Sequence, residues 1–153
     1  MPDPSFELLF QIKIELSSAI ELGQTPYGQL RRVDSFVEGR FEGPRLSGTL
    51  VAGGNDLRLT RFDGAFHPDV RALLHTDDDH HIQMTYEGIR SGSEEVWSRV
   101  ERGEDVDPSE YYFRIAVRFE AGSEKYGWLN RVLAFGSGVR LQGGPVYDIY
   151  QVL

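Results

Sequence analysis

Apolar and polar side chains alternate along the stretch Phe6-Glu7-Leu8-Leu9-Phe10-Gln11-Ile12-Lys13-Ile14-Glu15-Leu16. Its six even positions are apolar, and Leu9 is the one apolar residue at an odd position. A period of two is typical of a β-strand with one buried face. Leu9 is therefore expected on the outer side of this strand. A second strand of the same kind is predicted over 111–119, where the odd positions are apolar and the other face carries polar side chains.

Seven shorter runs with β-branched or aromatic residues bring the predicted number of strands to about nine. They lie at about 30–41, 46–52, 57–62, 70–76, 82–87, 131–141 and 146–152. Clusters of Gly, Pro, Asp and Asn separate them, which is typical of hairpin turns. Two further segments, 93–100 and 123–130, have helical character, and the first begins with a serine suited to cap a helix.

This order of elements indicates an all-β protein whose strands form a single antiparallel β-barrel with one or two short helices. Closing the sheet into a barrel removes the exposed edges that an open sheet must protect. A β-sandwich is the alternative. Since the chain of 153 residues shows no repeat, linker or low-complexity tract, residues 1–153 are expected to form one domain, with an acidic helical insertion at about 91–110.

The charge balance argues against polyanionic partners. The chain has 16 Lys+Arg against 24 Asp+Glu, a formal net charge of −8, and its field repels phosphates unless a basic patch overcomes it. No such patch occurs in the sequence, so neither nucleic acid nor a membrane is expected as a partner. The N-terminal residues lack the basic region of a secretory signal, which predicts a cytoplasmic protein.

The sequence offers little for a metal or a cofactor. Cys is absent, which excludes thiol nucleophiles, disulfides and Cys-ligated metals. No phosphate-binding loop, nucleophile elbow or His-Glu-x-x-His helix occurs, and Gly136-Ser137-Gly138 favours a strand bend or bulge over a dinucleotide loop. The His and Asp residues of 75–81 favour a polar hairpin tip over a metal site. A site without metal or cofactor is therefore expected.

Four polar residues are candidates for catalysis. Asp56 follows Gly53-Gly54-Asn55 and is either a turn residue or a carboxylate at a barrel mouth, where burial would raise its pKa and suit it to acid–base chemistry. Arg71 and Arg114 lie in the middle of predicted strands, and Tyr112 shares a face with Arg114. If those faces line the barrel, these groups can stabilise a carboxylate, enolate or carbonyl oxygen. The alternative is an outer face or an internal ion pair.

A second group of residues is a candidate for substrate binding. Tyr126, Trp128 and Asn130 alternate after an acidic and basic turn, which would suit an aromatic lid with an amide donor beside it. Packing in the core is the alternative, because Tyr and Trp bury large apolar areas wherever they lie.

Several ordered blocks of the sequence resemble a known family. They are Gly39-Arg40-Phe41-Glu42-Gly43-Pro44-Arg45-Leu46-Ser47-Gly48, Gly53-Gly54-Asn55-Asp56, Tyr111-Tyr112-Phe113-Arg114 and Tyr126-Gly127-Trp128-Leu129-Asn130-Arg131. Together they resemble the domain-of-unknown-function family 3237 over essentially the whole chain. The resemblance implies a small bacterial or fungal β-barrel of calycin-like or cyclase-like architecture, in a family without a settled common activity. The chain departs from the family pattern at Leu57, where Trp is frequent, and at Asp79-His80-His81.

Three functions remain open at this stage. The first is a small-molecule-binding barrel that acts as a cofactor-independent isomerase, cyclase or lyase on a small carbonyl or carboxylate compound. The second is a non-catalytic carrier or sensor of a small lipophile, since the mouths of β-barrels favour such ligands. The third is a homo-oligomeric structural or interaction protein, for which an outward Leu9 would be a weak indication.

Overall fold

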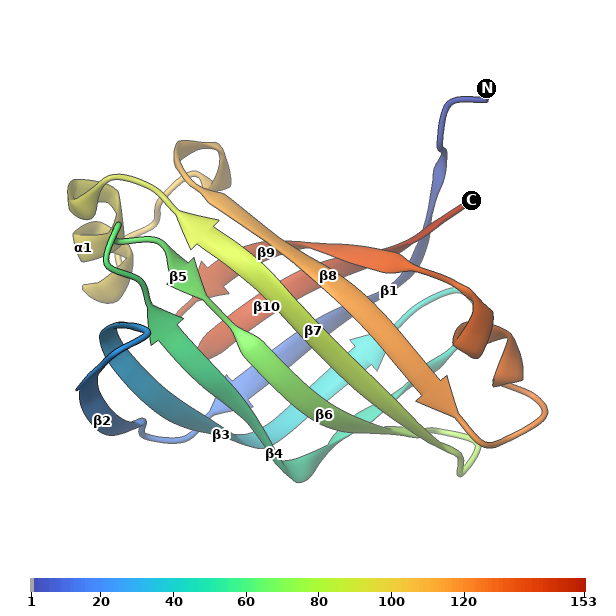
Figure 1. Ribbon diagram of the computed structural model, residues 1–153. Coiled ribbons are helices and arrows are strands. Elements are labelled where there is room, and N and C mark those ends of the chain that lie inside the picture. Colours follow the sequence, from blue (N-terminus) through green and yellow to red (C-terminus); the bar gives the residue numbers. More distant parts are fainter. Residues whose placement is uncertain (1) are drawn as a thin grey trace.

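Antiparallel pairing joins eight strands into a closed ring in the computed structural model, which describes residues 2–153 (Figure 1). The ring runs β1–β3–β4–β6–β7–β8–β9–β10 and returns to β1, while the short β2 and β5 extend it at one end. The strands are β1 (Phe6–Leu16), β2 (Ile20–Thr25), β3 (Gly28–Glu42), β4 (Ser47–Thr60), β5 (Phe66–His67), β6 (Asp69–Thr76), β7 (His81–Ser91), β8 (Tyr112–Ala121), β9 (Ala134–Leu141) and β10 (Gly144–Val152). The predicted all-β barrel is confirmed, with ten strands rather than nine.

Strand β4 differs from the prediction because it is one strand and not two. The glycines at its centre form a bulge, at which β4 carries extra residues opposite β6 between Val51 and Asn55. Gly53 adopts a φ of 106° there, a conformation that glycine tolerates without steric cost. The predicted turn before Asp56 is therefore wrong, and Asp56 lies inside a continuous strand.

Leu9 is buried, so the expectation of an outward Leu9 is wrong. The pairing of β1 with β10 shifts register between Leu8 and Phe10. This irregularity turns both Leu9 and Phe10 into the interior, where they are 1% and 0% exposed. Leu9 therefore gives no indication of an oligomer.

Strand β9 is regular where a bend or bulge was predicted. Its pairing with β10 continues through Gly136 and Gly138 without a shift, and its pairing with β8 continues through Gly136 to Ser137. A Cβ atom at Gly138 would lie 2.7 Å from the Tyr147 ring and 2.8 Å from the Phe113 ring. These glycines are needed because they leave room for large side chains inside the barrel.

The two ends of the barrel carry different helices (Figure 1). Helix α1 (Glu94–Glu101) lies at the left end, and its predicted serine cap is confirmed, because the Ser93 hydroxyl accepts a hydrogen bond from the Val96 amide at 3.2 Å. The 3₁₀ helix η1 (Pro108–Glu110) follows, and η2 (Gly127–Arg131), drawn in orange-red, lies at the opposite end. No helix that the structure describes has the length and apolarity to cross a membrane.

Apolar side chains fill the barrel at the η2 end. Phe10 packs against Phe41 and Phe119 with ring centroids 5.3 and 6.0 Å apart, and Leu74 and Met84 beside them are fully buried. The interior changes in character toward α1, where polar side chains take the inward positions of the same strands.

Candidate functional site

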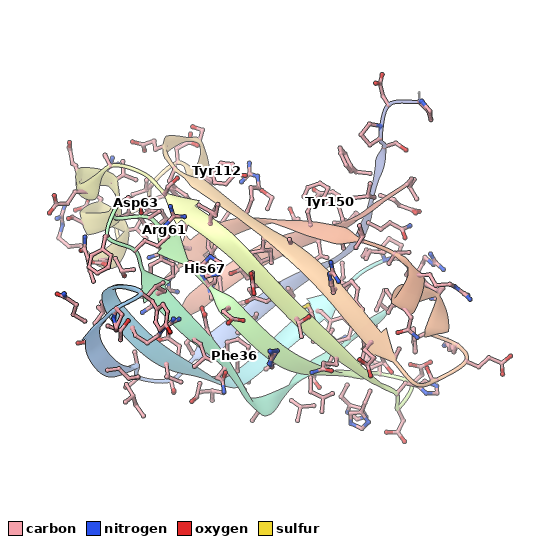
Figure 2. All side chains as sticks on the ribbon, viewed as in Figure 1. Phe36, Arg61, Asp63, His67, Tyr112 and Tyr150 are labelled. Atoms are coloured by element: carbon pink, nitrogen blue, oxygen red, sulfur yellow. The ribbon has the colours of Figure 1, made fainter. Side chains whose placement is uncertain are left out.

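Three of the four predicted catalytic residues lie on the outer surface of the barrel. Arg71 and Arg114 are exposed, and Tyr112 is 51% exposed at the α1 end (Figure 2). The Arg114 guanidinium donates a hydrogen bond to the Phe113 carbonyl at 2.9 Å and lies 5.3 Å from the Tyr112 ring. Of the two alternatives, the outer face holds, and these residues do not line the lumen. The inward side chains of β6 and β8 are Val70, Phe113 and the residues at every second position from them.

The predicted substrate-binding residues lie at the η2 end and have structural contacts. The Tyr126 hydroxyl donates to the Asp78 carboxylate at 2.7 Å, and Trp128 lies 3.6 Å beneath the Arg45 guanidinium. The Asn130 amide pairs with both the N–H and the carbonyl of Ala121 at 2.8 Å. These three residues do not lie together with Asp56, which belongs to the other half of the barrel.

Asp56 points into the lumen at the α1 end. It pairs across the sheet with Asp34 on β3 and Val70 on β6, both of which are buried. Its Oδ1 accepts a hydrogen bond from the Asp69 amide at 3.0 Å. Burial raises the pKa of the Asp56 carboxyl to about 7, and the attraction of Arg58 opposes this only in part. A carboxyl with such a pKa can both donate and accept a proton near neutral pH.

Two buried phenols lie near Asp56. We call the polar part of the interior formed by Asp56, these phenols and the arginines described next the chamber. Tyr86 on β7 and Tyr147 on β10 meet edge to face, with ring centroids 5.4 Å apart, and their hydroxyl groups are hydrogen-bonded to each other. Burial raises the pKa of both phenols, and the nearby Asp56 carboxylate raises them further. Both therefore stay protonated and can act as hydrogen-bond donors.

Four arginines point inward at the same end and were missed in the sequence. They are Arg32, Arg58, Arg90 and Arg140. The Arg58 Nε atom lies 3.0 Å from the Asp34 carboxylate and the Arg32 Nη2 atom lies 3.8 Å from it. Burial lowers the pKa of Arg58 and of Arg140. Asp34 thus holds two of the four guanidinium groups.

Arg90 has no carboxylate partner within salt-bridge distance among residues 2–153, although it is only 9% exposed. Its guanidinium carbon lies 3.9 Å from the ring centroid of Phe66 and 4.1 Å from that of Trp97. The buried Nε atom has no hydrogen-bond partner. Burial, together with repulsion by Arg58 and Arg140, lowers the pKa of Arg90 to about 10, so the group remains charged at neutral pH.

Two adjoining hollows of about 420 and 870 Å³ lie beneath α1, on the arginine side of the chamber. Asp56, Tyr86 and Tyr147 line neither of them. Residues that line both are Arg32, Arg58, Arg90, Trp97 and Glu101. Small-molecule sites usually enclose between about 300 and 1,000 Å³. The predicted acidic insertion is therefore part of the mouth, since its helix supplies Trp97 to the wall and Glu101 to the rim.

The polar residues of the chamber escaped prediction because its strands reverse the usual alternation. On β4, Leu57 is 43% exposed while Arg58 is buried, and on β7 Ile89 is 43% exposed while Arg90 is buried. A pattern that assigns apolar residues to the interior selects the wrong face here. The sequence did allow the inward position of Tyr86 to be predicted. Tyr86 lies two residues after Met84 and four after Ile82, so all three side chains point to the same face of β7.

Comparisons with known proteins agree with this fold. A beta-barrel like protein from Acinetobacter baumannii AYE is 37% identical, with a TM-score of 0.87 over 100% of this chain and 98% of that chain. The solved structure of RPA1785 from Rhodopseudomonas palustris, a conserved protein of unknown function, is 31% identical, with a TM-score of 0.93 over 100% of both chains.

A fungal relative is named as an enzyme. The hydroalkoxylation enzyme phnH of Penicillium herquei is 26% identical over 97% of this chain and 84% of its own length. A solved enzyme from the same fungus is 25% identical, with a TM-score of 0.75 over 100% of this chain and 98% of that chain. The family model described as protein of unknown function (DUF3237) matches residues 4–152. The expected resemblance is thereby confirmed, and the chain belongs to the DUF3237 family.

Proposed function

We propose that the protein is a cofactor-independent enzyme that moves a proton within a small carbonyl or carboxylate compound, as an isomerase or cyclase does. The observation that carries this proposal is the position of Asp56, whose carboxyl lies in the lumen with its pKa raised to about 7. Such a value lets one group serve as base and then as acid at neutral pH, which is where general acid–base catalysis is most efficient.

The groups around Asp56 supply the second requirement, a place for negative charge on oxygen. When the Asp56 carboxylate removes a proton from the carbon next to the carbonyl group of an unsaturated carbonyl compound, the electron pair of that C–H bond moves onto the carbonyl oxygen. The phenols of Tyr86 and Tyr147 and the guanidinium of Arg58 can stabilise that enolate. The protonated Asp56 then returns the proton to another carbon of the same molecule. The net change is the transfer of one proton from one carbon to another of the same molecule, so the reaction needs no oxidant or reductant.

The fungal relative supports this class of reaction. Hydroalkoxylation, the activity in the name of phnH, adds a hydroxyl group across a carbon–carbon double bond. The hydroxyl loses its proton, a C–O bond forms as the π bond breaks, and a carbon gains a proton. That chemistry needs a proton-transfer group beside a cavity. Asp56 is the group that we propose, and the hollows lined by the neighbouring Arg58 and by Arg90 are the cavity.

The test is proton exchange followed by NMR in D₂O, with β-tetralone as the probe because its α-protons are acidic. We expect wild type to accelerate exchange over buffer and Asp56→Asn to lose about 100-fold or more of that acceleration, the usual range for a general base. Asp148→Asn is the matched control, since Asp148 lies on the outer face of β10, where Gln11 donates to it. Binding of the ketone without any acceleration by wild type would contradict the proposal and favour a carrier.

A further inference from the structure

We propose that the arginine cluster under α1 is an anion site, centred on Arg90, that receives the carboxylate or phenolate of a planar organic acid. The inference rests on the proposed function, because it assigns the charged end of the substrate for the same chamber. It goes further in naming the residue that recognises this end and in requiring the ligand to be anionic.

The charges inside the chamber do not balance. Four guanidinium groups point inward, and the carboxylates of the interior are Asp34 and Asp56. Asp34 is occupied with Arg58 and Arg32. Glu101 lies on α1 at the rim, where it is exposed and acts on Arg90 only through space. The side chains of the chamber therefore carry an excess of positive charge in a protein whose net charge is −8.

Arg90 and Arg140 are the two of the four that have no carboxylate within salt-bridge distance among residues 2–153, and Arg90 is the more deeply buried. Burying a guanidinium without a carboxylate is costly, and the neighbouring Arg58 and Arg140 repel Arg90. The ring centroids of Phe66 and Trp97 lie 3.9 and 4.1 Å from the guanidinium carbon of Arg90, and their cation–π attraction compensates for the burial only in part. A bound anion would remove the imbalance.

The geometry around Arg90 also selects the kind of anion. The N–H groups of a guanidinium lie in its plane, and Arg90 can present them to a ligand because its side chain lines both hollows. The Nε atom is itself buried and has no partner among the described residues. The edge of a guanidinium matches the two oxygens of a carboxylate in one plane. Arg90 lines both hollows, so a ligand that enters beneath α1 meets it directly.

The rest of the ligand must be flat and partly apolar. The walls around Arg90 include Phe66, Trp97 and Phe113, and the hollows have the volume of a small organic molecule. Tyr147 lies close enough for the charge of Arg90 to act on its phenol, so a molecule anchored at Arg90 can extend toward Tyr147 and the proposed proton-transfer group Asp56. An aryl or unsaturated carboxylate, or a phenolate, meets these requirements.

The experiment is calorimetric titration with β-naphthoate and with β-naphthamide, its neutral isostere. We expect β-naphthoate to bind wild type with an affinity that falls as salt rises, and β-naphthamide to bind at least about tenfold more weakly. Arg90→Gln should weaken β-naphthoate about tenfold or more and leave β-naphthamide unchanged. Arg90→Lys should restore only part of the loss, because an ammonium lacks the planar fork. Arg114→Gln, on the outer face of β8, is the matched control and should bind as wild type.

A second measurement separates recognition from folding. Since Arg90 is an uncompensated buried charge, the melting temperature of ligand-free Arg90→Gln should equal or exceed that of wild type, although its affinity is lower. A purely structural arginine would show the reverse. Equal affinity of wild type for the acid and the amide, unchanged affinity in Arg90→Gln, or no binding of β-naphthoate at millimolar concentration would each overturn the proposal.

Asp56→Asn distinguishes a failure of this inference from a failure of the proposed function. If the variant binds β-naphthoate at least as tightly as wild type while wild type accelerates no proton exchange, the anion site stands and the catalytic proposal fails. If wild type accelerates exchange but does not prefer the acid over the amide, the catalytic proposal stands and the anion site fails.

Discussion

The two ends of the barrel use the same residue types in opposite ways. At the η2 end, Asp78 accepts hydrogen bonds from Lys125 and from the Tyr126 hydroxyl, and these donors hold its pKa well below its usual range. At the α1 end, Asp56 accepts one backbone hydrogen bond, and burial raises its pKa to about 7. Both carboxylates lie near a tyrosine, and the direction of each pKa shift depends on whether hydrogen-bond donors satisfy the charge or burial leaves it unsatisfied.

The interiors of the two ends also differ in how completely side chains fill them and in whether those side chains are charged. The η2 half is filled by rings and aliphatic side chains in contact, with Phe10 at 0% exposure. The α1 half contains charged groups that border open volume, among them a guanidinium without a carboxylate partner. One half of the barrel therefore supplies stability, and the other half holds charged groups at a cost in stability that a ligand can offset.

The largest effect is expected from Phe10→Ala at the packed end. Removal of a fully buried aromatic ring costs about 3–5 kcal/mol of unfolding free energy, because it leaves a cavity among Phe41 and Phe119. Urea denaturation monitored by fluorescence measures the loss. A loss below about 1 kcal/mol would contradict the division of the barrel into a packed half and an open half.

Asp56→Asn is expected to change how stability depends on pH. Because the folded pKa is about 7 and the unfolded pKa is about 3.9, the folded protein holds a proton between these values that the unfolded chain has lost. The stabilising effect of protonation is thus full below pH ~4 and is lost as pH rises to about 7. As pH rises through this window, the free energy of unfolding of wild type should fall by up to a few kcal/mol relative to that of Asp56→Asn, since one pKa unit corresponds to about 1.4 kcal/mol. Parallel pH profiles in urea melts would contradict this.

Gly138→Ala tests whether the chamber needs its glycines. The added methyl group would lie 2.7 Å from the Tyr147 ring and 2.8 Å from the Phe113 ring, so both must move. We expect a destabilisation of about 1–3 kcal/mol and a shifted tyrosine signal in near-UV circular dichroism. Ser137→Ala, at the next position of β9 with its side chain facing away from the lumen, is the control. A variant with the stability and spectrum of wild type would show that the rings have space to spare.

The smallest effect is expected from Asp78→Asn, with a sign opposite to that of Asp56→Asn. The pKa of Asp78 is lowered in the folded protein. The ionised Asp78 carboxylate therefore adds to the free energy of unfolding above pH ~4, and this stabilisation is lost on acidification. The group is exposed and its ion pair is screened by solvent, so the change should be slight and confined to neutral pH. A change as large as that of Asp56→Asn would remove the contrast between the two ends.

The sequence predicted the barrel because most of its strands follow the usual alternation, as β1 and β8 do. It could not predict the faces at the α1 end, where the lumen takes Arg58 and Arg90 and the outer surface takes Leu57 and Ile89. The polar interior inverts the pattern on which the prediction depends. Asp56 was identified as a candidate for its chemistry, but its partners come from five different strands, and only the closed ring brings them together.

The most direct test of the account is the pKa of Asp56 in the folded protein, measured by NMR of its labelled side-chain carboxyl carbon between acid and neutral pH. The account predicts a midpoint near 7 in wild type, displaced upward when Arg58 is replaced by Gln because the attraction of that guanidinium is lost. A midpoint near the ordinary value of about 4, unmoved by Arg58→Gln, would contradict the claim that this chamber holds a proton-transfer group.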